Sequence, residues 1–245
     1  YEKLLFTVPT YVQPKLDGVR CILKDGKLTT RNGKPIVSCP HLEEKGLFLD
    51  GELYNHDLKH DFDKIISLTR KTKPEPEDLE ESKNLIKFYV YDQPGDAVFV
   101  TRYANIFLPK SDTRFELVPT YEVKTLEEIE VFHEQFLSLG YEGTMIRLDL
   151  GGYENKRSKQ LLKYKSFQDD EFTILDVIEG EGNRSGMAGK LVCALPNGGT
   201  VGVSMTGTQE FMTKVLADKS KIIGLQATVK YFGYTNDGSL RFPTL

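Results

Sequence analysis

The amino-acid sequence predicts an α+β protein of two domains, in which antiparallel sheets with flanking helices precede a small β-barrel. Its 245 residues are too many for one small core and suggest about two domains. Short apolar runs broken by turn signals fill residues 10–54. From Phe167 onward, Gly-rich turns separate several more short strands. We therefore place the domain boundary at 167/168 and expect domains of residues 1–167 and 168–245.

The strands of the first domain are predicted from turn residues and composition. "KDGK" (Lys24–Lys27) and "RNGK" (Arg31–Lys34) contain the Asp-Gly and Asn-Gly pairs that favour β-hairpins. "LFLDGELY" (Leu47–Tyr54) and "IKFYVYD" (Ile86–Asp92) have the composition of strands. The acidic, Pro-containing segment Lys71–Asn84 between them is expected to be a solvated loop or a short exposed helix.

The clearest helix is predicted over Thr125–Leu139. Thr125 and Glu128 have the spacing of a capping box, and Gly140 follows as a stop signal. Apolar residues recur between these ends at helical spacing and predict a face buried in the core. They are Leu126, Ile129, Phe132 and Phe136. In the second domain, one helix is expected around Glu210–Leu216.

The composition excludes several classes of protein. A hydrophobic content of 39% and a mean hydropathy of -0.36 are typical of a soluble globular protein. No apolar run approaches the roughly 18 residues that span a bilayer. Three dispersed cysteines without a CxxC pair favour a reducing, intracellular compartment, either cytoplasm or, for a eukaryotic virus, nucleus or viral factory. A net charge of -4 argues mildly against a dedicated nucleic-acid binder, although the distribution of charge matters more.

Lys15, in "YVQPKLDGVRC" (Tyr11–Cys21), is a candidate nucleophile. A lysine is normally protonated, but nearby cations lower its pKa and free the amine to attack. Arg20 is one such cation, and Lys163 and Lys165 of "LLKYKSF" are others if the fold returns them. Two lysines on one face of a strand repel each other unless an anion lies between them, and phosphate is the natural anion.

Carboxylates and one tyrosine complete the candidate site. "LDGEL" places Asp50 and Glu52 on one strand face, and "EGTMIR" contains Glu142 with Arg147. Such hard oxygen ligands suit Mg²⁺. Tyr91 of "YVYD" has the ring that stacks on bases. Each feature alone is common in turns, exposed edges or cores; their order along the chain indicates one shared site.

This order (KxDGxR, DGE, YVYD, EGxMIR, LLKxK) resembles that of ATP-dependent DNA ligases, in the covalent nucleotidyltransferase superfamily. The resemblance runs from about Pro14 to Pro243. "YEGTMIR", "LLKYKSFQDDEFTILDV" and "VKYFGYTNDGSLRFP" favour a DNA ligase within the superfamily. It implies a minimal enzyme with an adenylation (nucleotidyltransferase) domain and an OB-fold barrel. The barrel is expected to lack its basic C-terminal end, so that self-adenylylation is slow while a pre-adenylylated nick is sealed at a near-normal rate.

The resemblance also implies how the nucleotide is bound. Lys15 would attack the α-phosphate of ATP and carry AMP as a lysyl phosphoramidate. Lys163 and Lys165 would grip the AMP phosphate. Glu52 would hydrogen-bond the ribose, and Tyr91 would stack on adenine.

Metal and DNA contacts are implied in the same way. Asp50 and Glu142 would hold Mg²⁺ or another divalent cation. Arg20 would contact the nucleotide or the nick phosphate. Arg31 of "TTRNGKPI" would bind DNA phosphate. Arg157 of "ENKRSKQLLKYK" would lie near the reacting phosphates and would also bind DNA.

The expected partners are nicked duplex DNA and ATP, with the chain acting as a monomer and without a membrane. An RNA ligase or a GTP-using mRNA capping enzyme remains an alternative. A catalytically silent OB-containing nucleic-acid-binding module is an alternative of another class. The retained lysines and carboxylates argue against that module, and most RNA ligases lack such a barrel. A role in replication and a role in repair both remain open.

Overall fold

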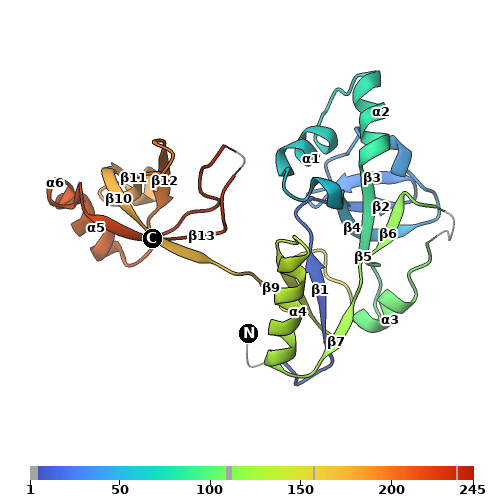
Figure 1. Ribbon diagram of the computed structural model, residues 1–245. Coiled ribbons are helices and arrows are strands. Elements are labelled where there is room, and N and C mark those ends of the chain that lie inside the picture. Colours follow the sequence, from blue (N-terminus) through green and yellow to red (C-terminus); the bar gives the residue numbers. More distant parts are fainter. Residues whose placement is uncertain (1–4, 109–111, 157, 236) are drawn as a thin grey trace. The chain divides into compact units, whose positions relative to one another are not determined.

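The protein is described by a computed structural model that covers residues 5–108, 112–156, 158–235 and 237–245 (Figure 1). It forms two compact units, an N-terminal unit Tyr1–Lys165 and a C-terminal unit Ser166–Leu245. The boundary between the two units, after Lys165, therefore lies two residues before the boundary expected at 167/168. No helix in the described ranges is long and apolar enough to cross a membrane.

One sheet of the N-terminal unit ends at Lys15 on one of its strands and leads directly into Lys165 from another. Its strand order is β7-β1-β8-β9, and all neighbours are antiparallel. The strands are β7 (Tyr121–Val123), β1 (Thr10–Lys15), β8 (Gly143–Leu148) and β9 (Leu161–Tyr164). Helix α4 (Leu126–Ser138) packs on β1 and β8. Val12, Ile129 and Phe136 lie in the core between the helix and the sheet.

A second sheet of the N-terminal unit has the strand order β3-β2-β4-β5-β6. Its neighbours are antiparallel except for β5 and β6, which are parallel. The strands are β3 (Lys27–Thr30), β2 (Val19–Lys24), β4 (Phe48–Tyr54), β5 (Lys87–Asp92) and β6 (Phe115–Leu117). Strand β5 alternates, so that Phe88 and Val90 lie in the core while Tyr91 faces the other way and is only half-buried.

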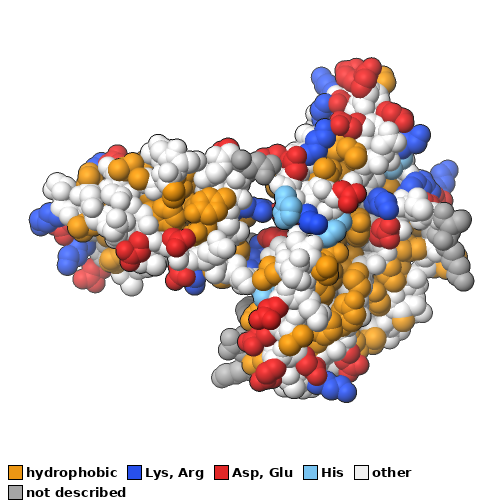
Figure 2. Space-filling view, viewed as in Figure 1, with side chains coloured by type: hydrophobic (Ala, Val, Ile, Leu, Met, Phe, Trp, Pro, Cys, Tyr) orange, Lys and Arg blue, Asp and Glu red, His pale blue; other side chains and the backbone are white. Residues whose placement is uncertain are grey.

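Helices surround this second sheet. They are α1 (Phe62–Thr69), α2 (Pro76–Leu85), α3 (Phe99–Ala104) and the 3-10 turns η2 (Pro40–Leu42) and η3 (His56–Leu58). Helix α2 occupies the acidic segment for which the sequence predicted a loop or a short exposed helix. Figure 2 shows acidic side chains gathered over it at the top of the view.

The C-terminal unit is the predicted small barrel. Its sheet has the antiparallel order β12-β11-β10-β13. The strands are β12 (Thr200–Ser204), β11 (Ala188–Ala194), β10 (Gln168–Glu179) and β13 (Gln226–Tyr231); the helices are η4 (Gly182–Arg184), α5 (Gln209–Ala217) and α6 (Lys219–Ile222). The last residues join the two edge strands, because the Ser204 N–H donates to the Pro243 carbonyl (3.1 Å) and the Thr244 N–H to the Lys230 carbonyl (2.9 Å). Helix α5 confirms the helix expected at Glu210–Leu216.

The two predicted hairpin turns differ in how many residue pairs flank them. At Asp25 and Gly26 both φ angles are positive, 48° and 78°, as a two-residue hairpin between β2 and β3 requires. The "RNGK" segment turns at Gly33 and brings its two flanks together as an antiparallel bridge between Thr29 and Pro35. Beside this bridge, the Thr30 N–H donates to the Lys34 carbonyl (2.8 Å) and the Ile36 N–H donates to the Leu28 carbonyl (2.9 Å). The hairpin expected there does form, but it is short, because among the described residues its ladder consists of this single bridge.

Helix α4 follows its prediction with two differences. The Thr125 side chain caps the Glu128 N–H (3.2 Å), but the Glu128 carboxylate accepts from the Lys124 N–H (2.7 Å) rather than from Thr125. Leu126 is 52% exposed, whereas His133 is buried. Its imidazole is held by a hydrogen bond with the Thr144 hydroxyl (3.0 Å). A polar residue thus lies in the buried face because β8 supplies a partner.

We expect Gly51→Ala to destabilise the N-terminal unit by about 1–3 kcal/mol, the cost typical of overpacking. A Cβ on Gly51 would lie 2.3 Å from the Tyr89 carbonyl oxygen on the adjacent strand. Gly151→Ala is the matched control, since a Cβ there meets no atom within 4 Å. Chemical denaturation of the two variants measures the difference. Equal stability of both would contradict this account of β4 packing against β5.

Candidate active site

Lys15, Glu142 and Lys165 meet where three strands of the first sheet lie side by side. Lys15 ends β1 and pairs with Gly143, the first residue of β8. The Glu142 N–H donates to the Lys15 carbonyl (3.0 Å). The Glu142 carboxylate binds both ammonium groups, Oε2 to Lys15 and Oε1 to Lys165. Three side chains from distant parts of the sequence therefore form one ionic cluster.

Gly143 makes this cluster possible. Its φ is 152°, a region that residues with a side chain rarely adopt. A Cβ at this position would lie 2.6 Å from the Tyr164 carbonyl oxygen and 3.5 Å from the Lys165 Cα. The missing side chain lets the end of β9 approach β8, and this brings Lys165 to Glu142.

An open cleft of about 990 Å³ lies beside Lys15 within the N-terminal unit. Both sheets line it, and its size is in the range of small-molecule sites. Its walls are partly apolar, with Leu16, Ile146 and Leu162. Cationic side chains line it as well: Lys15, Arg20, Arg31, Arg147, Lys156 and Lys163. An apolar cleft with this many cations suits a ligand that carries both an aromatic ring and phosphates.

Glu52 and Tyr91 line the same cleft from adjacent strands. The Tyr91 hydroxyl donates to Glu52 Oε2 over 3.4 Å, and the Arg147 guanidinium lies 5.2 Å from the centre of the Tyr91 ring. Burial raises the pKa of Glu52 to about 8, with Lys15 acting in the opposite direction. Burial also raises the pKa of Tyr91, so its hydroxyl stays a hydrogen-bond donor at neutral pH.

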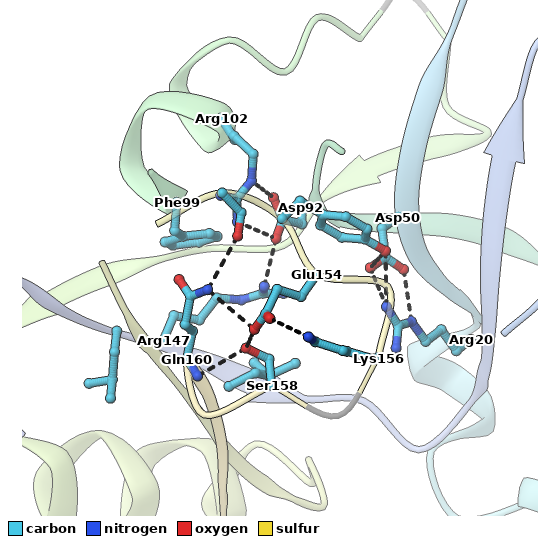
Figure 3. A pocket seen from close by; sticks show the side chains of 14 residues that line it. Arg20, Asp50, Asp92, Phe99, Arg102, Arg147, Glu154, Lys156, Ser158 and Gln160 are labelled. Atoms are coloured by element: carbon cyan, nitrogen blue, oxygen red, sulfur yellow. Dashed lines mark hydrogen bonds and ion pairs between the residues drawn. The ribbon is translucent and has the colours of Figure 1, made fainter. Parts of the chain in front are cut away.

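Half-buried Arg20 and buried Asp50 form an ion pair (Figure 3). Arg20 Nε donates to Oδ1 (3.0 Å) and Nη2 to Oδ2 (2.6 Å) of Asp50, which is 2% exposed. The Tyr153 hydroxyl donates to Oδ2 as well (2.8 Å). Three donors thus offset the cost of burying this carboxylate. Arg20 and Asp50 were both expected in the site from the sequence, but their pairing was not predicted, and Tyr153 was not expected there.

A second ionic network joins the two sheets of the N-terminal unit. Asp92 on β5 is 1% exposed and accepts from Arg102 Nε (2.9 Å), Arg102 Nη2 (3.0 Å) and Arg147 Nη1 (2.8 Å). Arg147 lies on β8 and also donates from Nε to Gln13 on β1 (2.7 Å). Arg147, which the motif placed near Glu142, therefore binds Asp92. The only sign of this network in the sequence was Arg147, a charged residue in the otherwise uncharged strand β8.

The remaining predicted residues are basic, and two of them line the cleft. Lys163 on β9 is exposed and lines the cleft, whereas Lys165 follows the strand and contacts Glu142. Arg31 is exposed in the turn after β3 and lines the cleft. Arg157 lies outside the described residues. Lys156, which no sequence motif had indicated, also lines the cleft.

Comparison with known proteins places the chain in a family. A model of the ATP-dependent DNA ligase domain matches residues 1–165, and a model of the DNA ligase OB-like domain matches residues 179–245. The DNA ligase of Haemophilus influenzae is 28% identical over 237 residues, which are 94% of this chain and 83% of that protein. A DNA ligase of African swine fever virus is 30% identical over 213 residues, 76% of this chain but only 48% of the viral protein.

Solved structures show the same fold. A Lig E DNA ligase aligns with 100% of this chain and 94% of its own, at a TM-score of 0.82 and 24% identity. The ATP-dependent DNA ligase of bacteriophage T7, in complex with ATP, aligns with a TM-score of 0.56 over 98% of this chain and 92% of its own, at 18% identity. The family models cover most of the chain, including every described residue of the ionic cluster and the cleft. The chain belongs to the ATP-dependent DNA ligase family.

Proposed function

We propose that this chain seals nicks in duplex DNA with ATP, through a lysyl-AMP intermediate and a DNA-adenylate. The observation that carries this proposal is the Lys15–Glu142–Lys165 cluster beside a cationic cleft of nucleotide size. The family match favours this function over an RNA ligase, a capping enzyme or a silent binding module.

In the first step, Lys15 Nζ attacks the α-phosphorus of ATP. A P–N bond forms, the P–O bond to pyrophosphate breaks, and the amine loses its proton. Glu142 is within contact of Nζ and so both orients the lysine and offers a proton acceptor. Lys165 and Lys163 add positive charge where the phosphate becomes more negative. Glu142 binds both lysines of the cluster, and the incoming phosphate offers them a second anion.

The next two steps use the same charges. An oxygen of the 5′-phosphate at the nick attacks the phosphorus of lysyl-AMP, and the P–N bond breaks to return Lys15. The 3′-hydroxyl then attacks the 5′-phosphorus and expels AMP. Arg20 and Arg31 line the cleft. Arg20 supplies charge for the phosphates of ATP as well as for the nick phosphate, and Arg31 supplies charge for the DNA phosphates. Positioning and charge stabilisation contribute more to such transfers than proton movement does.

The nucleoside of ATP is proposed to lie against Glu52 and Tyr91. Their side chains lie 3.4 Å apart between hydroxyl and carboxylate, so a ribose near Glu52 leaves its base near the Tyr91 ring. Arg147 already covers one face of that ring, and a stacked adenine would use the other.

A divalent cation, Mg²⁺ or a related metal, is also proposed. The described residues contain no group of three acidic, histidine or cysteine side chains that could hold a metal unaided. Mg²⁺ fits this site best when phosphate and water supply most of its ligands, and when bound it would neutralise phosphate charge. Glu142 suits it as one carboxylate ligand. Asp50 is the second proposed carboxylate ligand. In the structure the oxygens of both carboxylates already have partners, Lys15 and Lys165 on Glu142 and Arg20 and Tyr153 on Asp50.

The C-terminal unit is proposed to contribute a surface that binds DNA. The chain is proposed to act at a nick as a monomer. Its exposed Arg184, Lys190 and Lys230 are available for phosphate contacts. Contacts of this kind release counterions, so binding to a nick should weaken as salt increases.

We expect Lys15→Arg to abolish covalent attachment of AMP. Arginine keeps the positive charge beside Glu142, but its guanidinium stays protonated and cannot attack phosphorus. Intact protein mass after incubation with ATP and Mg²⁺ detects the adduct, and GTP in the same assay tests the capping alternative. Lys64→Ala, which removes an exposed lysine paired with Glu81, serves as the control and should form the adduct. A Lys15→Arg protein that gains the mass of AMP would overturn the mechanism.

We expect Tyr91→Leu to impair ATP use more than Tyr91→Phe. Phenylalanine keeps a ring for stacking, worth roughly 1–3 kcal/mol per base, and loses only the long hydrogen bond to Glu52. The apparent KM for ATP in self-adenylylation measures the difference, and it should rise on the order of tenfold or more for the Leu variant. Equal KM values for both variants would place the Tyr91 ring in a purely structural role.

The Glu52 carboxyl should make ligand-free stability depend on pH. Its folded pKa of about 8 lies above its ordinary value of 4.5, so the folded protein keeps a proton that the unfolded chain has lost. This contribution is complete below about pH 4.5 and disappears as the pH rises through about 8. Glu52→Gln should therefore gain stability relative to the unsubstituted protein between pH 5 and 8, on the order of a few kcal/mol.

Urea denaturation across that pH range measures this effect. Glu43→Gln, at an exposed position on the same unit, is the control and should show a constant difference. A constant difference for Glu52→Gln as well would mean that its folded pKa is not raised.

A further inference from the structure

Tyr153, in the segment between β8 and β9, contacts two groups of the proposed site. Its hydroxyl donates to Asp50 Oδ2 (2.8 Å) and accepts from Arg20 Nη2 (3.1 Å). Its backbone N–H donates to the Gly95 carbonyl (2.9 Å), and the Arg102 guanidinium lies 5.9 Å from its ring centre. The phenol is therefore held from several sides while its oxygen completes the Arg20–Asp50 pair seen in Figure 3.

Arg20 has hydrogen-bond donors beyond those that bind Asp50 and Tyr153. A guanidinium has five N–H groups in a fixed fork. Nε and one hydrogen of Nη2 bind Asp50, and the other hydrogen of Nη2 binds Tyr153. Among the described residues, no hydrogen bond uses Nη1. The two N–H groups of Nη1 are thus left for a ligand, and Arg20 itself lines the cleft beside Lys15.

We propose that Tyr153 is a positioning residue that fixes the Arg20 guanidinium, so that Nη1 is presented to a phosphate of ATP bound in the cleft. This inference rests on the proposed function and extends it. Two bonds to Asp50 alone allow the guanidinium to tilt about the carboxylate; the third bond, from another segment of the chain, removes that freedom. The phenol can donate and accept at once because burial raises its pKa and keeps it protonated.

A purely structural role predicts something different. The segment that carries Tyr153 also carries Lys156 and Ser158, which line the cleft. If Tyr153 only held this segment in place, its hydroxyl would matter whatever residue stood at position 20. If it acts through Arg20, its effect depends on the arginine.

The first experiment compares Tyr153→Phe with the unsubstituted chain in single-turnover self-adenylylation at saturating ATP and Mg²⁺. We expect a rate lowered about tenfold, the change typical when one hydrogen bond to a charged group is lost. Tyr103→Phe is the matched control. Its hydroxyl donates to the Val118 carbonyl (2.7 Å) and contacts neither Arg20 nor Asp50, so its rate should stay within twofold.

The second experiment repeats the change in an Arg20→Lys background. Lysine keeps a cation beside the buried Asp50 but lacks the fork that Tyr153 orients. We expect the double variant to react no more slowly than Arg20→Lys alone. Such non-additivity is what a double-mutant cycle reports for residues that act together.

The outcomes are separable. A Tyr153→Phe rate within twofold of the unsubstituted chain, or the same tenfold loss in both backgrounds, overturns the inference and leaves the proposed function standing. Failure of Tyr153→Phe to fold, judged by its thermal unfolding beside Tyr103→Phe, also overturns it, because the hydroxyl would then serve stability. An unsubstituted chain that forms no adduct overturns the proposed function, and this inference with it.

Discussion

The buried contact between Arg147 and Asp92 is the constraint on which the site depends. Arg147 belongs to the sheet that carries Lys15, whereas Asp92 belongs to the sheet that carries Glu52 and Tyr91. A buried charge is costly unless it is paired, and loss of one partner leaves the other uncompensated. Arg102 completes the pairing of Asp92. The network therefore fixes how two separately formed sheets meet, and the cleft between their side chains follows from that fit.

Within this frame the site is built from ion pairs rather than from isolated charges. Glu142 binds two lysines, and Asp50 binds Arg20 and Tyr153. Each carboxylate holds in place cations that are proposed to lie near phosphate. A lysine or arginine fixed in this way has already lost much of its conformational freedom, so less entropy is lost when the phosphates arrive. This arrangement suits a reaction whose barrier depends on orientation and on charge.

The sequence predicted individual residues better than their partners. Lys15, Glu142 and Lys165 were expected in one site, and the structure brings them together. The pairing of Arg147 with Asp92 was not foreseen, because the two residues are far apart in sequence and each motif describes only its own strand. The second hairpin was expected from its Asn-Gly turn, and it forms only a short antiparallel contact around Thr29 and Pro35.

The sequence by itself determined the α+β class, the barrel, helix α4 and the set of candidate site residues. These follow from periodicity, turn residues and motif order, which are local properties of the chain. Only the tertiary structure decided which carboxylate binds which cation, that Tyr91 faces the cleft, and that Tyr153 joins Arg20 to Asp50. Those contacts join strands and loops distant in sequence, and they depend on how the sheets pack and how close glycine lets neighbouring strands approach.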